Sequence, residues 1–305
     1  LPGATLTVYK TGTMTKASIY DLTGAARANP MTVDSTGLAQ FQFQVGQICD
    51  VVWSLGAYTS PRLMVGGDAT GILSILAVIP EFYGAVGDGV EDDRIPIENA
   101  CASLGVTGGI VLLSSFATYR VSTLSVPAGC FVRGTMERPD SRQNFTADGL
   151  STLPGIAVDS SGTILLGTNA GITNCFVKRT GMTFPAASWT AFDGVGVSLG
   201  GDSCVIRNCM IVGFDKCVGV SGSVVSANRY TIEGMWADGK NGIYLDKPSF
   251  DSSSIVDCHM YPYTTIPTTT FASLGRPGAG IYIRGNQDDT RLDHVLCIGY
   301  YRNFD

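Results

Sequence analysis

The chain has 305 residues, carries a formal net charge of −6, and contains 38 glycines but only 15% charged residues. An average soluble domain has about 25% charged residues and about 7% glycine, so this composition indicates a chain that buries much of its surface, in part against other copies of itself. The negative charge without a basic stripe argues against nucleic acid as a partner, and no run approaches the roughly 18 apolar residues that membrane insertion requires.

Residues 1–67 are predicted to form a small all-β domain. Apolar and polar residues alternate in ATLTVYKTGT (4–13). In AQFQFQV (39–45), Phe41 and Phe43 lie on one face and glutamines lie on the other. Strict alternation of this kind is typical of a half-buried strand. The residues VDSTG (33–37) supply a turn.

The linker between two domains is placed at residues 68–80. This segment is apolar as far as Pro80, which fits a short helix packed against partner chains or under the next domain. The second domain is predicted to span residues 81–305.

Four acidic residues lie within six positions, from Asp88 to Asp93. Apolar residues then recur at the i, i+3, i+4 and i+7 spacing from Ile97 to Leu104, which is one face of a helix. An aspartate just before such a run, here Asp92 or Asp93, is an N-cap, which accepts hydrogen bonds from the first-turn amides. The sequence therefore predicts a capping helix near 93–104 and an acidic cluster that starts it, with a metal site or a catalytic pair of carboxylates as alternatives.

A group of turn and strand residues in the first domain resembles the small N-terminal module of bacteriophage tail fibres and tailspikes. The matching residues are IYD (19–21), Gly24, NP (29–30), Asp34, Gly37, Phe41, Phe43 and GQICDVVW (46–53). In that family the module joins the fibre to the virion tail. The resemblance therefore implies that residues 1–67 contact other phage tail proteins.

The start of the second domain is similar to the opening of the pectate-lyase-superfamily β-helix. The similarity is carried by FYGAVGDGVEDDRIPIENA (82–100) and GGIVLLSSFATYRVSTLSVPAGCFVRG (108–134). Glu91, Arg94 and Pro96 replace the family's usual Thr, Thr and Ala, but these departures touch only the helix cap and its first turn. Because phage tailspikes commonly carry this opening, the resemblance implies a homotrimeric tail protein of the virion that is assembled in the bacterial cytoplasm.

Internal repetition supports a β-solenoid independently of that resemblance. An apolar-x-polar-apolar motif recurs with its first residues at Ile172, Ile206, Ile232, Ile255 and Leu292. A second series, glycine followed by alternating apolar residues, begins at Gly196, Gly219, Gly242 and Gly280. Two offset strand signals per repeat of about 23 residues describe one turn of a solenoid, so the fold class is all-β, with a right-handed parallel β-helix over 81–305.

A break in the alternation after the first motif marks a corner of the solenoid. Asn174 and Asn208 take this position in two repeats, where we expect them to stack as a hydrogen-bonded ladder of side chains. Asp257 and His294 occupy the same register, which favours a structural role over catalysis for both.

Cys175, Cys209 and Cys258 recur beside the corner residues and are predicted to point into the solenoid as reduced thiols. The nine cysteines are an odd number and form no CxxC pair, which argues against a zinc ribbon and for folding in a reducing cytosol. We expect neither a metal nor a cofactor.

Longer steps between repeats locate two insertions. Both series lengthen by about 14 or 15 residues near 259–279, and the first series also lengthens between Cys175 and Val205. In solenoids such insertions map to surface loops, often on the binding face. Their aromatic residues are Phe184, Trp189 and Phe192 in the first insertion and Tyr261, Tyr263 and Phe271 in the second.

No catalytic constellation stands out in the sequence. Glycoside cleavage needs two carboxylates about 5 to 10 Å apart. The candidates are Glu233, Asp257, Asp288, Asp289 and Asp293 as acids, Arg284 and Arg291 as the base of a lyase, and His259 and His294 as the only histidines. Corner, turn and solvated strand positions account for these residues at least as well.

Trp236, Tyr261 and Tyr263 are the candidates for glycan binding. Aromatic side chains offer flat apolar area with polar tips, on which sugar rings stack. The alternative is that these residues pack under the loops or between subunits.

Two functional classes follow. The first is a tailspike or tail fibre protein that attaches to the virion tail and serves adhesion to a host surface polysaccharide. The second is a depolymerase, a hydrolase or lyase acting on capsule or lipopolysaccharide, whereas a cellular pectin-active enzyme would leave the first domain unexplained. The missing catalytic constellation favours the first class, and because YYRNFD (300–305) ends within a repeat, we expect further chain or a partner subunit beyond Asp305.

Overall fold

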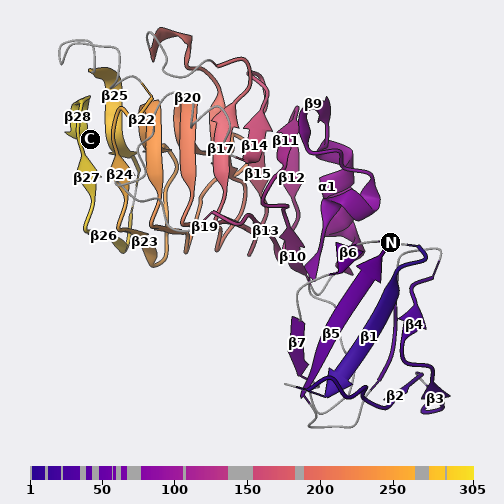
Figure 1. Cartoon of the computed structure of the whole chain (residues 1–305). Coiled ribbons are helices and arrows are strands. Elements are labelled where there is room, and N and C mark those ends of the chain that lie inside the picture. Colours follow the sequence, from indigo (N-terminus) through magenta and orange to yellow (C-terminus); the bar gives the residue numbers. More distant parts are fainter. Residues whose placement is uncertain are drawn as a thin grey trace. The chain divides into compact units, whose positions relative to one another are not determined.

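The computed structural model divides the chain into two units, Leu1–Ile75 and Leu76–Asp305 (Figure 1). The described residues are 2–10, 13–21, 23–34, 39–42, 48–56, 58–59, 63–66, 77–105, 108–136, 154–182, 189–264, 275–285 and 287–305. None of the described helices is long and apolar enough to cross a membrane.

The end of the predicted linker belongs to the second unit. Strand β8 (Ala77–Val78) pairs in parallel with β10 (Gly109–Leu112), so the solenoid starts before residue 81. Pro80 begins a helical turn rather than closing one, because the 3-10 helix η1 spans Pro80–Tyr83. The remainder of the predicted linker helix, up to residue 76, lies outside the described residues.

The first unit has an antiparallel sheet with its own core. Alternation along β1 (Thr5–Lys10) buries Leu6 and Val8, as the sequence pattern predicts, and Phe41 is buried as well. Phe43 and most of the predicted turn at 33–37 lie outside the described residues. The other strands of this unit are β4 (Met31–Thr32), β5 (Ile48–Leu55), β6 (Tyr58–Thr59) and β7 (Leu63–Gly66) in the sheet, and the separate pair β2 (Ile19–Tyr20) and β3 (Ala26–Arg27).

Two polar side chains hold the irregular part of the first unit. The Oδ1 atom of Asn29 accepts a hydrogen bond from the Val8 N–H (3.0 Å), and its amide donates to the Val8 carbonyl (2.7 Å), so Asn29 acts in place of a strand partner. The Oδ1 atom of Asp21 accepts hydrogen bonds from the N–H groups of Thr23 (2.8 Å) and Ala25 (3.0 Å). This Asx-type turn connects β2 to β3.

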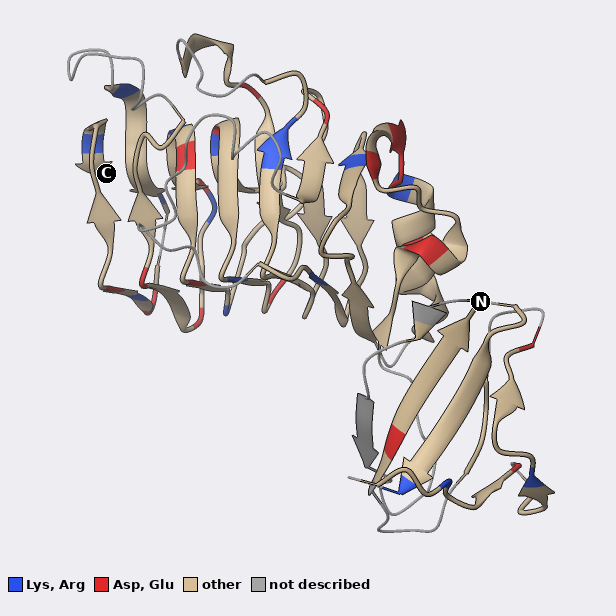
Figure 2. Ribbon diagram, viewed as in Figure 1, with Lys and Arg blue, Asp and Glu red and all other residues tan. Residues whose placement is uncertain are grey.

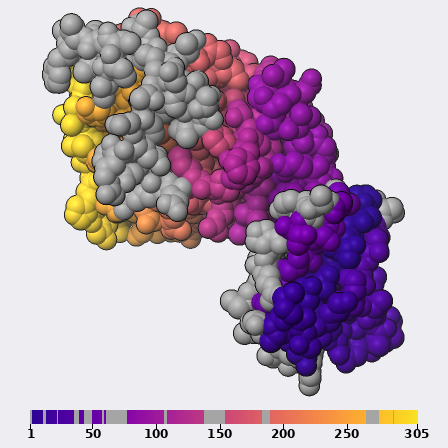
Figure 3. All heavy atoms as spheres, viewed as in Figure 1, coloured from indigo at the N-terminus to yellow at the C-terminus, as the bar shows by residue number. Residues whose placement is uncertain are grey.

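The second unit is a parallel β-solenoid in which successive coils add strands to three faces. The coils follow one another as bands of colour in Figure 3. Face 1 consists of β8, β10, β13 (Cys130–Arg133), β16 (Gly171–Thr173), β19 (Val205–Arg207), β21 (Thr231–Glu233), β23 (Ser253–Val256) and β26 (Thr290–Asp293). Face 2 consists of β9 (Asp88–Asp92), β11 (Thr118–Val121), β14 (Gly155–Val158), β17 (Phe176–Arg179), β20 (Met210–Val220), β22 (Trp236–Leu245), β24 (His259–Met260) and β27 (Leu296–Cys297). Face 3 consists of β12 (Leu124–Val126), β15 (Ile164–Leu166), β18 (Val195–Leu199), the second halves of β20 and β22, β25 (Arg276–Ile283) and β28 (Tyr300–Phe304).

Strand pairing on face 1 confirms the first repeat series. Ile172 pairs with Ile206, Ile206 with Ile232, and Ile232 with Ile255, which in turn pairs with Leu292. The four isoleucines are completely buried. Each contributes about 1.5–3 kcal/mol relative to an exposed side chain, so this inner column is a main source of stability.

The glycine series is wrong by two residues at one repeat. Gly242 does lie opposite Gly280, but Cys217 rather than Gly219 takes the position between Gly196 and Gly242. A shift of two residues keeps every side chain on its own face, so alternation alone cannot detect it. At Gly242 a Cβ atom would collide with the carbonyl oxygen of Gly280, which explains the glycine there.

Residues in the left-handed conformation form the corner between faces 1 and 2. Asn174, Asn208, Asp257 and His294 have φ values of 57°, 51°, 54° and 48°. Asn and Asp adopt this conformation more readily than other side chains. The corner is therefore where the sequence predicts it. The hydrogen bonds that link the coils there come from the backbone N–H groups of Asn174, Asn208 and Asp257, which donate to carbonyls of the next coil. The side-chain amide of Asn174 donates instead to the Met136 carbonyl (2.8 Å).

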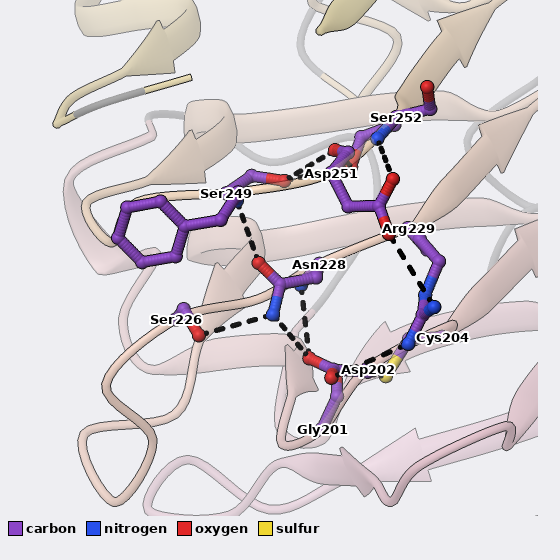
Figure 4. Close-up of polar contacts among 11 residues, drawn as sticks. Gly201, Asp202, Cys204, Ser226, Asn228, Arg229, Ser249, Asp251 and Ser252 are labelled. Carbon is purple, nitrogen blue, oxygen red and sulfur yellow. Dashed lines mark hydrogen bonds and ion pairs between the residues drawn. The ribbon is translucent and has the colours of Figure 1, made fainter. Parts of the chain in front are cut away.

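A ladder of side chains occurs instead at the corner between faces 3 and 1 (Figure 4). The Asn228 amide donates to Asp202 Oδ1 (2.9 Å), and Asn228 Oδ1 accepts a hydrogen bond from the Phe250 N–H (2.8 Å). Arg229 lies 3.9 Å from the Asp202 carboxylate and 3.5 Å from that of Asp251. Each link joins neighbouring coils, so this ladder fixes the register of three coils.

Helix α1 (Arg94–Ser103) takes the place of a face 3 strand in the first coil and packs against β10 and β12. Ile97, Ala100, Cys101 and Leu104 are buried, as their spacing predicts. The helix covers the core at the N-terminal end of the solenoid (Figure 1).

The acidic cluster, which Figure 2 shows in red beside α1, binds backbone amides. A hydrogen bond from the Val90 N–H lowers the pKa of Asp88. Asp92 Oδ1 accepts hydrogen bonds from the N–H groups of Arg94 (3.1 Å) and Ser122 (3.2 Å); burial acts to raise the pKa of Asp92, but these bonds outweigh it and the pKa is lowered. Within the described residues no group of three or more His, Cys, Asp or Glu side chains is suited to a metal ion.

Asp93 precedes α1 but does not cap it through its side chain. The side chain is 1% exposed, and its two oxygens accept hydrogen bonds from the N–H groups of Val86 (2.7 Å) and Gly87 (3.0 Å). Burial raises the pKa of Asp93, against these two hydrogen bonds. Of the two aspartates that the sequence offers as the cap, Asp92 is therefore the one that binds a first-turn amide, that of Arg94. Asp93 instead ties the preceding loop to the helix, because the backbone turn at Gly87 brings those amides within reach.

The corner cysteines point into the solenoid as predicted. Cys175, Cys209 and Cys258 are at most 1% exposed, and every cysteine of the chain is buried and free of disulfides. Burial raises the pKa of Cys209 and of Cys258 to about 12.

Candidate functional site

Two insertions of the solenoid line a cavity of about 550 Å³. The first runs between β17 and β18 and contains the 3-10 helix η3 (Trp189–Ala191), and the second runs between β24 and β25. Repeat spacing in the sequence places both insertions correctly. Phe184 and Phe271 lie outside the described residues.

Aromatic side chains line this cavity. Trp189 comes from the first insertion, Tyr261 from the second, and Tyr300 and Tyr301 from β28. Tyr301 is 80% exposed, whereas Tyr300 is buried at 8%. The cavity therefore offers flat apolar surface together with phenol and indole groups that hydrogen-bond at their edges.

A buried carboxylate holds both ends of the second insertion. Asp238 on β22 is completely buried, and its Oδ2 atom accepts hydrogen bonds from the N–H (2.8 Å) and the hydroxyl (2.6 Å) of Thr264. Its Oδ1 atom accepts hydrogen bonds from Nε (2.8 Å) and Nη2 (2.6 Å) of Arg276, whose side chain is also completely buried. Thr264 and Arg276 flank residues 265–274, so one carboxylate ties the two ends of this segment to face 2.

The same ion pair connects the two insertions. The ring of Phe192, in the first insertion, is completely buried and its centroid lies 5.4 Å from the Arg276 guanidinium carbon. Burial raises the pKa of Asp238, while Arg276 and Thr264 act in the opposite direction. Because Arg276 also lines the cavity, the position of the aromatic walls depends on Asp238.

The sequence-derived glycan candidates lie in one group of stacked rings. The Trp236 and Tyr263 rings are stacked at 5.0 Å and 8°, and Tyr263 contacts Tyr261 at 5.0 Å with a tilt of 56°. The His259 ring also stacks on Trp236, at 5.1 Å. Tyr261 lines the cavity, whereas Trp236 is only 5% exposed and packs with Met210 in a second core on the outside of face 2.

A polar hollow of about 290 Å³ lies at the other end of this stack. It is lined by Trp236, Asp257, His259 and His294. The Nδ1 atom of His294 lies 3.2 Å from the carboxylate of Asp293 and 3.9 Å from that of Asp257. Asp257 and Asp293 therefore both lie beside His294, and His259 lines the same hollow.

Ion pairs limit what these acids can do as catalysts. Asp293 pairs with Arg291, and the hydrogen bond from Arg291 lowers the pKa of Asp293. A catalytic general acid needs a raised pKa, so Asp293 does not fit that role. Glu233 pairs with Arg207 (2.8 Å).

The remaining candidates lie elsewhere on the solenoid. Asp289 accepts a hydrogen bond from the Ser252 hydroxyl (2.8 Å), and the Asp288 N–H donates to the Ser249 carbonyl (3.1 Å). Both acids therefore join neighbouring coils at the corner between faces 3 and 1. Arg284 is exposed after the end of β25.

Asp238 and Arg276, which hold the cavity together, do not stand out in the sequence. Asp238 is a single acidic residue at an outward position of a strand, where aspartate is normally solvated. Its partner in the neighbouring coil is Val212, which is also outward and completely buried. The apolar Val212 at this outward position is the one sequence signal that the outer surface of face 2 is buried there.

Comparisons with known proteins concern the fold alone. No family model and no curated protein matches the chain. Among solved structures, the chain is similar to a proposed glycosyl hydrolase from Parabacteroides merdae (11% identity, TM-score 0.46, 73% of this chain and 96% of that one). It is also similar to the catalytic unit of a GH87 α-1,3-glucanase from Streptomyces thermodiastaticus (13% identity, TM-score 0.41, 100% and 60%) and to ORF18 of Geobacillus virus E2 (14% identity, TM-score 0.22, 84% and 66%).

Proposed function

We propose that the second unit binds a polysaccharide, whose sugar residues enter the cavity between the two insertions. The observation that carries this proposal is the set of aromatic side chains that two separate insertions and β28 bring to one cavity. Sugar rings have apolar faces and hydroxyl edges, and they stack on aromatic rings while their hydroxyls hydrogen-bond at the rim. A host surface polysaccharide is the expected ligand class.

Recognition is better supported than cleavage. No Asp or Glu is among the described residues that line the cavity, and Asp238 beneath it is saturated with hydrogen bonds from Thr264 and Arg276. Glycoside hydrolysis requires two carboxylates across the scissile bond. Among the described residues, Asp257 and Asp293 are the acids that meet at the polar hollow, and the lowered pKa of Asp293 does not fit a general acid.

A second proposal concerns the first unit: it attaches the protein to a phage tail, and the complete protein is a homotrimer of the virion. It rests on the resemblance of residues 1–67 to tail-fibre modules and on a core in the first unit that is separate from that of the second. Deletion of residues 1–67 should leave a folded trimer that no longer joins the particle. A monomeric intact chain in solution, or a truncated chain that still joins tails, would overturn this proposal.

The test of glycan binding uses the full chain against a panel of bacterial surface polysaccharides. We expect wild-type protein to bind at least one of them, and the double variant Trp189→Ala/Tyr301→Ala to lose at least about tenfold in affinity, since its aromatic walls are removed. Phe116→Ala is the matched control, because Phe116 is 95% exposed and lies before β11, outside the cavity. Equal binding by the double variant and the control would refute the cavity as the binding site.

A further inference from the structure

The polar hollow and the aromatic cavity are joined by a continuous row of side chains. Tyr261 lines the cavity and Trp236 lines the hollow, and the ring of Tyr263 contacts both, with two centroid distances of 5.0 Å. His259 continues the row by stacking on Trp236 inside the hollow. A linear chain of sugars is a ligand that could occupy two hollows at this spacing.

The two hollows differ in chemistry. The cavity is lined mainly by aromatic and apolar groups, whereas the hollow presents the Asp257 carboxylate and two imidazoles, with the Asp293 carboxylate beside His294. Carboxylate oxygens accept hydrogen bonds, and imidazole both accepts and donates. Such groups match the hydroxyls of a sugar, and charge-assisted hydrogen bonds of this kind are the stronger ones.

The corner geometry aims these groups outward. Asp257 and His294 sit at successive left-handed corner positions, so neighbouring coils place them side by side. The equivalent positions in earlier coils hold Asn174 and Asn208, which shows that the fold needs no charge or imidazole there. The turn therefore does not require an acidic side chain or an imidazole at this corner, and both groups line the hollow, where a ligand would meet them.

We propose that the polar hollow is a second sugar subsite, so that the protein recognises an extended oligosaccharide whose hydroxyl-rich residues reach from the cavity to Asp257 and His294. This inference rests on the proposed glycan binding in the cavity. We therefore expect affinity to increase with the length of the oligosaccharide, because a short sugar fills the cavity alone and a longer one also fills the hollow.

The histidines give a readout that needs no substitution. The chain contains only two, His259 and His294, and both line the hollow. In NMR titrations with disaccharides and hexasaccharides cut from the polysaccharide that binds the wild-type chain, the imidazole signals should shift with the hexasaccharide and stay in place with the disaccharide. Unchanged imidazole signals at saturating hexasaccharide would overturn the subsite.

The corner itself supplies the variants. Asp257→Asn and His294→Asn place in the hollow the residue that the same corner carries elsewhere, so the fold is expected to persist, and Asp289→Asn at the opposite corner is the control. We expect the wild type to bind the hexasaccharide about tenfold more tightly than the disaccharide, and the Asp257→Asn/His294→Asn double variant to lose this gain while keeping its affinity for the disaccharide.

The outcomes separate the two proposals. An unchanged length dependence in the double variant would overturn the second subsite and leave cavity binding intact. Equal weakening for both lengths would also overturn it, because the hollow would then not be a separate subsite. Failure of the wild type to bind any polysaccharide would instead refute the proposed function.

Discussion

The two ends of the second unit use acidic residues in opposite ways. At the N-terminal end, the carboxylates of Asp88, Asp92 and Asp93 lie close together in sequence, and each accepts hydrogen bonds from backbone amides. Near the C-terminal end, Asp238 stands alone in the sequence and holds Thr264 and Arg276 from far along the chain. The acidic cluster thus holds the loop and helix that cover the N-terminal end of the solenoid, whereas the single residue Asp238 holds the insertion that lines the cavity.

The largest effect should come from removing the isolated carboxylate. Asp238→Ala leaves the Arg276 guanidinium buried without its partner, which typically costs about 3–5 kcal/mol. Urea unfolding should show this loss. Glu233→Ala, which breaks the half-exposed pair with Arg207, should cost only about 0–1 kcal/mol. Similar losses for both variants would contradict the structural role given to Asp238.

A smaller contrast exists within the acidic cluster. Asp93 uses both oxygens, one for Val86 and one for Gly87, so Asp93→Asn turns one acceptor into a donor that faces an N–H group and should cost about 1–3 kcal/mol. Asp92 accepts both of its hydrogen bonds at Oδ1, so Asp92→Asn can keep them and should cost less than about 1 kcal/mol. Chemical denaturation of the two variants compares them directly, and the reverse order would be inconsistent with these contacts.

The pH dependence of the same two residues should differ in sign. The pKa of Asp92 is lowered in the folded state, so its stabilisation is present above the unfolded value and lost as pH falls through the folded pKa. The pKa of Asp93 is raised by burial, so protonation favours the folded state and its contribution weakens as pH rises through the folded pKa. The stability difference between wild type and Asp92→Asn should therefore shrink in acid, while that between wild type and Asp93→Asn should grow. Parallel pH profiles for the two variants would contradict the assigned environments.

The smallest effect is expected at the corner cysteines. Because burial raises the pKa of Cys209 and Cys258 to about 12, almost no thiolate forms at neutral pH. Labelling of these thiols with a maleimide should be slow in the native protein and fast in denaturant. Rapid native labelling, or a disulfide that includes Cys175, would show that the corner register is wrong.

Much of the fold could be predicted from the sequence because a solenoid repeats its local chemistry. The isoleucine column from Ile172 to Ile255 pairs as its spacing indicates, and the corner after it follows from the break in alternation. Gly219 was misplaced because a two-residue shift leaves the alternation unchanged. The sequence could not decide between Asp92 and Asp93 as the helix cap, because backbone amides on both sides compete for these carboxylates and only the folded turn at Gly87 brings its amide to Asp93.

The site was less predictable than the fold. Repeat spacing located both insertions, and Tyr261 does line the cavity, but Trp236 is largely buried and the cavity depends on Asp238 and Arg276. Their pairing joins residues far apart in sequence, and no local pattern encodes it. Repeat spacing can thus predict where an insertion leaves a solenoid, but not which strand residue, here Asp238, binds its ends.

The central claim is that the two insertions form a glycan-binding cavity, and a crystal structure with a bound oligosaccharide tests it most directly. The alternative binding surface is the stacked pair Tyr244 and Tyr282 on face 3. The centroids of these rings lie 4.3 Å apart, and Lys216 Nζ lies 3.9 Å from the Tyr244 centroid. We predict electron density for a sugar ring in van der Waals contact with Trp189 and Tyr261. Sugar density on Tyr244 and Tyr282 with an empty cavity would contradict the claim.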